Sequence, residues 1–199
     1  MRVVGGQFRG RPLASPKDER LRPTSDRVRE AVFNILLHGI PDFSLEGAKV
    51  LDLFAGTGAL GVEALSRGAA SCLFVEQDAE ARGLIRRNVE AFGLSGITKI
   101  FRRDATDLGP ASSRDQFTLV FADPPYGGGL AEKALISAAS GGWLAEGAIA
   151  VIEEAERSPL ELPAGFTELD RRTWGGTQVV FARYTSETDS AGLPDASEA

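Results

Sequence analysis

The chain has 199 residues, of which 43% are hydrophobic and 25% are charged, and a formal net charge of −6. This length predicts a single domain with its own hydrophobic core. A lone cysteine, Cys72, excludes an internal disulfide. With one histidine, His38, there are too few Cys and His ligands for a zinc cluster, so no metal is expected.

No segment reaches the roughly 20 apolar residues that a membrane span requires. The N-terminus also lacks the apolar core of a signal peptide. We therefore expect a cytoplasmic protein with no membrane partner.

The charge is distributed unevenly along the chain. Residues 1–30 contain eight Arg or Lys against four acids, a net charge of +4, so the remaining residues carry −10. Because Arg and Lys drive nucleic-acid affinity by neutralising phosphates, a basic arm on an acidic body indicates local contact with a polyanion. A solvated loop with charges on a helix surface explains the same pattern. Residues 186–199 have hardly an apolar side chain, which predicts a disordered acidic tail.

The first 40 residues are expected to form an N-terminal unit that packs on the body. Residues 3–13 place glycines between short apolar runs, a pattern that predicts a hairpin or an extended arm. Residues 24–26 then supply side chains that cap helices, and apolar residues recur at helical spacing up to Gly39. This second pattern predicts a helix.

From Lys49 onward, short apolar runs alternate with helical segments, which is typical of an open parallel sheet. Strands are predicted at 49–53, 71–76, 98–102, 117–122 and 148–153, and helices near 58–67, 79–92 and 129–139. Segments 167–173 and 177–184 flank Trp174-Gly175-Gly176, which predicts an antiparallel hairpin. Residues 41–185 are thus expected to form a Rossmann-like, doubly wound α/β domain, with a mostly parallel seven-stranded sheet and an antiparallel C-terminal hairpin.

A glycine-rich turn follows the first predicted strand. Gly56, Gly58 and Gly61 form G-x-G-x-x-G, in which glycines allow close backbone approach and the next helix offers free N–H groups. Alone this fingerprint is weak, because a tight strand-helix turn explains it as well. Asp52 near the strand end and Glu76, which lies 20 residues after Gly56 at the end of the next strand, favour a bound nucleoside. Glu76 fits a dinucleotide enzyme equally, so these residues leave the cofactor open.

Acidic residues lie at the ends of four predicted strands: Asp52, Glu76, Asp104 and Asp123. Any one of them alone is more often a cap or turn residue. Because ligands of open α/β sheets bind beyond the carboxyl ends of the strands, all four together indicate one crevice.

The fourth strand runs into Asp123-Pro124-Pro125-Tyr126. Proline has a fixed φ and no N–H, so the strand must stop there with its carbonyls free to accept. The Asp123 carboxylate and the Pro124 carbonyl can accept the two N–H groups of an amino-bearing base, and Tyr126 can stack on it. These four residues are the candidate catalytic residues.

With both motifs, the chain resembles the class I S-adenosylmethionine-dependent methyltransferases. Residues 52–58, Asp-Leu-Phe-Ala-Gly-Thr-Gly, look like their first motif, and residues 123–126 look like the signature of enzymes that methylate exocyclic amino nitrogens. Segments 9–11, 22–24 and 26–30 resemble the bacterial 16S rRNA guanine-N2 methyltransferases of the RsmD type. The resemblance covers residues 1–184.

The resemblance implies S-adenosylmethionine as the cofactor, with Asp52, Gly56 and Gly58 around its methionine part, Glu76 at the ribose and Asp104 at the adenine. The residues implied at the cofactor are Asp52, Phe54, Ala55, Gly56, Gly58, Glu76, Gln77, Asp104, Ala105 and Asp123. Those implied at the RNA are Arg9, Arg11, Arg22, Thr24 and Arg27. The implied partner is 16S rRNA, within a partly or fully assembled small subunit, bound by a monomer.

Three alternatives remain at this point. The tetrapeptide at 123–126 also fits a methyltransferase of adenine N6 or cytosine N4 in DNA. A nicotinamide-dependent oxidoreductase accounts for G-x-G-x-x-G and Glu76, but not for residues 123–126 or the basic arm. A non-catalytic RNA-binding module has no need of an intact Asp123-Pro-Pro-Tyr126.

Overall fold

The computed structural model describes residues 1–16, 25–112 and 116–186. The helical elements are η1 (Gly6–Phe8), α1 (Asp26–His38), α2 (Ala59–Ser66), α3 (Ala79–Ala91), η2 (Ser95–Ile97) and α4 (Leu130–Ser140). The strands are β1 (Lys49–Leu53), β2 (Ser71–Val75), β3 (Thr98–Phe101), β4 (Phe117–Ala122), β5 (Leu144–Ala155), β6 (Phe166–Trp174) and β7 (Thr177–Tyr184). Of the expected tail at 186–199, all but Ser186 lies outside the described residues.

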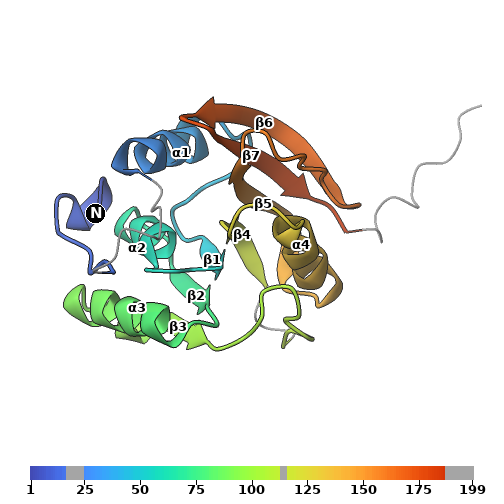
Figure 1. Ribbon diagram of the computed structural model, residues 1–199. Helices are drawn as coiled ribbons and strands as arrows, with labels where there is room; N and C mark the ends of the chain where they lie inside the picture. The colour runs from blue at the N-terminus through green and yellow to red at the C-terminus, as the bar shows by residue number, and fades with distance from the viewer. Residues whose placement is uncertain (17–24, 113–115, 187–199) are drawn as a thin grey trace, which may run out of the picture.

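One seven-stranded sheet, in the order β3-β2-β1-β4-β5-β7-β6, runs through the protein (Figure 1). β1 to β5 are parallel, and β7 pairs antiparallel with both β5 and β6. The predicted Rossmann-like fold with an antiparallel C-terminal hairpin is confirmed. The chain changes direction across the sheet between β1 and β4, which is the switch point where such folds form their ligand crevice.

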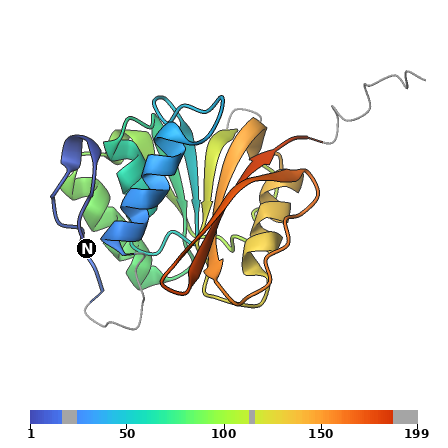
Figure 2. The same ribbon diagram turned by 90° about the horizontal axis from the view of Figure 1, so that it is seen from above.

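Helices cover both faces of the sheet, with α1, α2 and α3 on one face and α4 on the other (Figure 2). Successive strand residues point to opposite faces, so Val50 joins the core under α1–α3 while Leu51 joins the core under α4. Burial on both faces explains why the central strands read as continuous apolar runs rather than as an alternating pattern.

β5 begins four residues earlier than predicted. The sequence indicated a strand from Ala148, but Leu144 already pairs with Phe117, and the register then shifts so that Leu119 pairs with Ile149. Gly147 in this irregular stretch has a φ of 74°. Because this bulge contains polar residues and a glycine in the left-handed region, the start of the strand does not appear as an apolar run in the sequence.

Residues 1–16 form a hairpin-like arm that packs on α2 and α3. One antiparallel bridge joins Arg2 to Pro12, and the N–H of Val3 donates to the carbonyl of Arg11 at 3.0 Å. The close approach depends on Gly6, which has a φ of 71° and where a Cβ would lie 1.9 Å from the carbonyl oxygen of Ser66 in α2. The arm is therefore part of the folded body.

Glu63 in α2 holds this arm in place. Its fully buried carboxylate accepts the N–H of Val4 at 2.8 Å and that of Gly5 at 2.7 Å. The same carboxylate forms ion pairs with Arg67 at 2.7 Å and with Arg29 at 3.6 Å. Two cations and two backbone donors thus converge on one buried acid.

Arg29 completes the cluster from α1. It is fully buried, and it donates to Asp26 Oδ1 at 2.8 Å and to the carbonyl of Arg2. Arg29 contributes to the basic count of residues 1–30, but its guanidinium fastens α1 to the arm and does not belong to a charged surface.

Among the described residues, no helix is both long enough and apolar enough to cross a membrane.

We predict that Glu63→Ala lowers the free energy of unfolding by about 3–5 kcal/mol, because removing one member of a buried ion pair leaves its partners uncompensated. Urea denaturation of this variant measures the effect. The matched control is Glu90→Ala on exposed α3 surface, which we expect to change stability by less than about 0.5 kcal/mol. Equal stabilities of the two variants would contradict the clamping role.

A candidate active site at the carboxyl edge of the sheet

A cavity of 780 Å³ opens where the central parallel strands end. All four predicted acids line it: Asp52, Glu76, Asp104 and Asp123. They come from β1 and from the segments that follow β2, β3 and β4, which the parallel pairing brings to the same edge. The predicted Phe54, Ala55, Gly56, Gln77, Ala105, Pro124, Pro125 and Tyr126 also line the cavity.

The glycine-rich turn between β1 and α2 has two kinds of glycine. At Gly61, a Cβ would lie 2.4 Å from the Phe74 ring and 2.6 Å from Cys72 Sγ, so this glycine lets α2 pack on the sheet. Gly58, with φ 77°, is the N-cap of α2 and approaches the same ring. A Cβ on Gly56 would meet nothing closer than 3.9 Å, so its backbone is open for the approach of a ligand.

The first cavity-lining residue after β1 has a strained backbone. Phe54 has a φ of 58°, which non-glycine residues rarely adopt. Such strain persists where the surroundings enforce it, and it clusters at ligand sites. Here it turns the chain from β1 into the glycine-rich turn.

Asp52 is 1% exposed, and its Oδ2 accepts the N–H of Gly61 at 3.0 Å. Burial raises the pKa of this carboxyl to about 8. The hydrogen bond from Gly61 lowers the pKa, and the negative charge of Glu76 raises it by a smaller amount. Asp52 is therefore largely neutral at pH 7 until a cation approaches.

Glu76 connects the glycine-rich turn to the start of α3. Its Oε2 accepts the N–H of Gly56 and its Oε1 accepts the N–H of Asp78, both at 2.8 Å. A carboxylate has about four acceptor positions, so Glu76 can still accept hydroxyl groups while holding the turn.

Beyond β3, the cavity wall is fixed by local hydrogen bonds. Asp104 accepts the N–H of Thr106 at 2.8 Å and its hydroxyl at 2.7 Å, and these bonds hold the pKa of the Asp104 carboxyl below its ordinary value. Arg103 also lines the cavity and donates to the carbonyl of Leu108. Sequence reasoning did not identify Arg103, since a single arginine after a strand carries no spacing signal.

The N-terminal arm contributes to the same cavity, which sequence reasoning also missed. Met1 and Pro16 line it. Asn88 of α3, which is 1% exposed, accepts the N–H of Ala14 at 2.7 Å and donates to the carbonyl of Thr57 at 2.9 Å. The arm and the glycine-rich turn are therefore joined through one side chain. An asparagine on the apolar stripe of a predicted helix was the available signal.

The segment after β4 brings a flat ring to the cavity. Asp123 is partly exposed, Pro124 is buried, and Tyr126 is 43% exposed. The hydroxyl of Tyr126 donates to Glu153 Oε1 at 3.0 Å and lies 2.8 Å from Thr177 Oγ1. Burial raises the pKa of Tyr126 to about 12, and the charge of Glu153 adds to the shift.

The predicted RNA-binding residues differ in their surroundings. Arg9 and Arg27 are exposed. Arg11 donates to the carbonyl of Ala91 at 2.6 Å, and its guanidinium lies 4.4 Å from the centroid of the Phe92 ring. That side chain is engaged in docking the arm on the end of α3. The predicted Arg22 and Thr24 lie outside the described residues.

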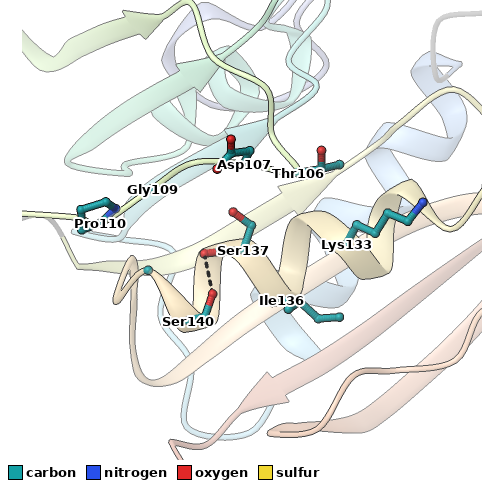
Figure 3. Close-up of a pocket in the computed structure, with 9 residues that line it drawn as sticks. Thr106, Asp107, Gly109, Pro110, Lys133, Ile136, Ser137 and Ser140 are labelled. Atoms are coloured by element: carbon teal, nitrogen blue, oxygen red, sulfur yellow. Dashed lines mark hydrogen bonds between the residues drawn. The ribbon is translucent and has the colours of Figure 1, made fainter.

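A second hollow of 560 Å³ lies between the segment after β3 and helix α4 (Figure 3). Thr106 lines both hollows. Ser137 accepts the N–H of Leu108 at 2.9 Å, and Lys133 Nζ donates to the carbonyl of Gly128 at 3.3 Å. Ser137 thus attaches the segment after β3 to α4, whereas Lys133 bonds to the turn that precedes its own helix.

We predict that Asp52 makes stability depend on pH between its ordinary pKa of 3.8 and about 8. In this window the folded state binds one more proton than the unfolded state, so the free energy of unfolding falls as pH rises. The slope is at most about 1.4 kcal/mol per pH unit, and it levels off above the folded pKa. Urea denaturation from pH 5 to 8 should show a flatter profile for Asp52→Asn than for the wild type. The exposed control Asp42→Asn should keep the wild-type slope, and identical slopes for all three proteins would rule out a neutral Asp52.

Comparison with known proteins assigns the chain to a family. The family described as Conserved hypothetical protein 95 matches residues 1–183. The ribosomal RNA small subunit methyltransferase D of Escherichia coli is 38% identical over 196 residues, which cover 98% of this chain and 94% of that protein. The protein of the same name from Haemophilus influenzae is 34% identical, over 88% of this chain and 89% of that relative.

Solved structures agree with this relationship. The Escherichia coli protein yhhF superposes with a TM-score of 0.79 at 33% identity, covering 94% of this chain and 99% of that one. The fold also matches that of the Thermus thermophilus 16S rRNA N2 G1207 methyltransferase RsmC, at a TM-score of 0.61 and 22% identity over 84% of this chain and 44% of that one. The resemblance to the RsmD type is confirmed, and the chain belongs to the Conserved hypothetical protein 95 family, together with the small-subunit rRNA methyltransferases D that it resembles along nearly its whole length.

Proposed function

We propose that this protein transfers a methyl group from S-adenosylmethionine to the exocyclic N2 amino group of a guanine in 16S rRNA. The observation that carries the proposal is the cavity itself, which is lined both by the glycine-rich turn and by Asp123-Pro124-Pro125-Tyr126. One hollow therefore offers both a nucleoside site and acceptors for an amino group.

The cavity residues fit S-adenosylmethionine. Gly56 leaves the backbone open to a ligand, and Glu76 can still accept hydrogen bonds from a ribose diol. An ammonium group near the buried Asp52 would stabilise the charged form of its carboxyl. Gln77, Asp104 and Ala105 form the wall proposed for the adenine. When bound, the cofactor supplies a methyl group that is activated by an adjacent sulfonium.

The segment at 123–126 is proposed to hold the base. The lone pair of an exocyclic amino group is delocalised into the ring, so the group is a poor nucleophile. The Asp123 carboxylate and the Pro124 carbonyl accept its two N–H groups, which favours a pyramidal nitrogen. Stacking on Tyr126 is worth about 1–3 kcal/mol. The target base must be unpaired or flipped out, because pairing occupies the same amino group.

The relatives support ribosomal RNA as the substrate, since those from Escherichia coli and Haemophilus influenzae are named small-subunit rRNA methyltransferases. A structure of similar fold, RsmC, was solved with AdoMet and guanosine. We propose that Arg9 and Arg27 contact rRNA phosphates, with Arg11 acting mainly to dock the arm. The proposed setting is a monomer acting in the cytoplasm on a partly or fully assembled small subunit.

For the proposed base acceptor, we expect Asp123→Asn to lower kcat about 100-fold, the typical cost of removing one electrostatic contact to a reacting group. S-adenosylhomocysteine binding, measured by calorimetry, should change by less than about threefold. Asp107→Asn in the second hollow is the matched control and should keep wild-type activity. A wild-type kcat in Asp123→Asn would contradict the proposed role of Asp123 as an acceptor for the amino group. Binding of NAD in place of S-adenosylhomocysteine would instead favour an oxidoreductase.

For Arg9 in the arm and Arg27 in α1, we expect Arg9→Glu and Arg27→Glu each to weaken binding to small subunits. Each lost phosphate contact should reduce the slope of log affinity against log salt by about 0.7–0.9. Filter binding at several salt concentrations measures both effects. Lys99→Glu on the edge strand β3 is the control and should leave the slope unchanged. A wild-type slope in both variants would show that neither Arg9 nor Arg27 contacts RNA.

A further inference from the structure

The loop that follows β4 is held from both faces of the sheet by two consecutive acids of β5. Val151 belongs to the core under α1–α3 and Ile152 to the core under α4. Because strand side chains alternate, Glu153 and Glu154 continue this pattern on opposite faces. Glu153 Oε1 accepts the Tyr126 hydroxyl at 3.0 Å, and Glu154 accepts the N–H of Gly127 at 3.1 Å.

Both acids are well buried, at 9% and 2% exposed, whereas Tyr126 is 43% exposed. Burial of two carboxylates is costly unless hydrogen bonds compensate it. The donors to these two acids include a phenol and a backbone N–H from one loop, and Glu154 also accepts the N–H of Ala155 in its own strand at 2.8 Å. The two acids therefore tie the loop to β5.

A second strand holds the same hydroxyl. Thr177 begins β7 and pairs with Ala155 of β5, so it lies on the strand next to Glu153. Its Oγ1 is 2.8 Å from the Tyr126 hydroxyl. Since the phenol has one proton, donated to the carboxylate, the threonine hydroxyl is the donor to the phenol oxygen.

These contacts fix the position of the phenol oxygen, and because a phenolic O–H prefers the plane of its ring, the two directed hydrogen bonds also restrict rotation of the ring. The main-chain end of Tyr126 follows two prolines with fixed φ, and its far end is held by Glu153 and Thr177. An exposed tyrosine whose ring is held at both ends is a preorganised stacking surface. An unanchored ring at the same position would sample other rotamers and lose that orientation.

We propose that Glu153 and Thr177 are positioning residues for the target base, acting through the hydroxyl of Tyr126. This inference rests on the proposed function, because it takes the stacked ligand to be the base that is methylated. The inference gives the tyrosine hydroxyl a role, whereas stacking on the base requires the aromatic ring alone.

The test is kinetic, with methyl transfer to small subunits that lack the modification. Tyr126→Phe keeps the ring and removes the hydroxyl. We expect it to lower kcat about tenfold, with KM and S-adenosylhomocysteine affinity within twofold of wild type. Glu153→Gln and Thr177→Val should act in the same direction. Because Glu153 acts only through the hydroxyl that Tyr126→Phe removes, Tyr126→Phe/Glu153→Gln should be no slower than Tyr126→Phe alone.

The matched control is Tyr184→Phe, which changes the other of the two tyrosines, at the opposite end of β7. It should retain wild-type kcat. Wild-type kcat in Tyr126→Phe, or fully additive losses in the double variant, would overturn the inference while leaving the proposed function intact.

A separate readout distinguishes failure of the contact from failure of the proposed function. In a Tyr184→Phe background, Tyr126 is the single tyrosine, so its ionisation can be followed by phenolate absorbance while circular dichroism monitors the fold. The midpoint should lie near 12 and fall when Glu153→Gln is added. An unchanged midpoint would overturn the contact. If the midpoint falls but the wild-type protein methylates no RNA, the proposed function fails, and the positioning role fails with it.

Discussion

The site depends on the parallel pairing of β1 with β2 and β4. The carboxyl ends of parallel strands all lie at one edge of the sheet. Residues that follow these strands therefore come together even though they are far apart in the chain and make no specific contacts with one another. The order β3-β2-β1-β4 then places the glycine-rich turn directly beside Asp123. A cofactor pocket and an acceptor for an amino group become neighbours because of the topology.

The N-terminal arm is the second constraint. Glu63 fixes its backbone to α2, and Asn88 joins it to the carbonyl of Thr57 in the glycine-rich turn. Met1 and Pro16 consequently form part of the cavity wall. The same segment carries exposed arginines and contributes to the wall of the proposed cofactor site, so the two proposed binding events share one structural unit.

Local patterns were sufficient to predict the strands and the acids that follow them, because an apolar run ending in an acid is visible within a few residues. Contacts between distant elements were not predictable in this way. Thr177 lies 51 residues from Tyr126 in sequence, and nothing near it indicates a link to the base site. Charge alone could not show how each arginine is used: Arg29 is buried, and Arg11 lies against Phe92, since guanidinium groups pack and hydrogen-bond as readily as they bind phosphate.

The most direct measurement is incubation with labelled S-adenosylmethionine and small subunits from a strain that lacks the modification, followed by mass mapping of the methylated nucleotide. The account predicts one methyl group on the N2 amino nitrogen of a guanine in 16S rRNA, absent when Asp123 is replaced. A methyl group on adenine N6 or cytosine N4, or the absence of transfer by a protein that binds the cofactor, would contradict it.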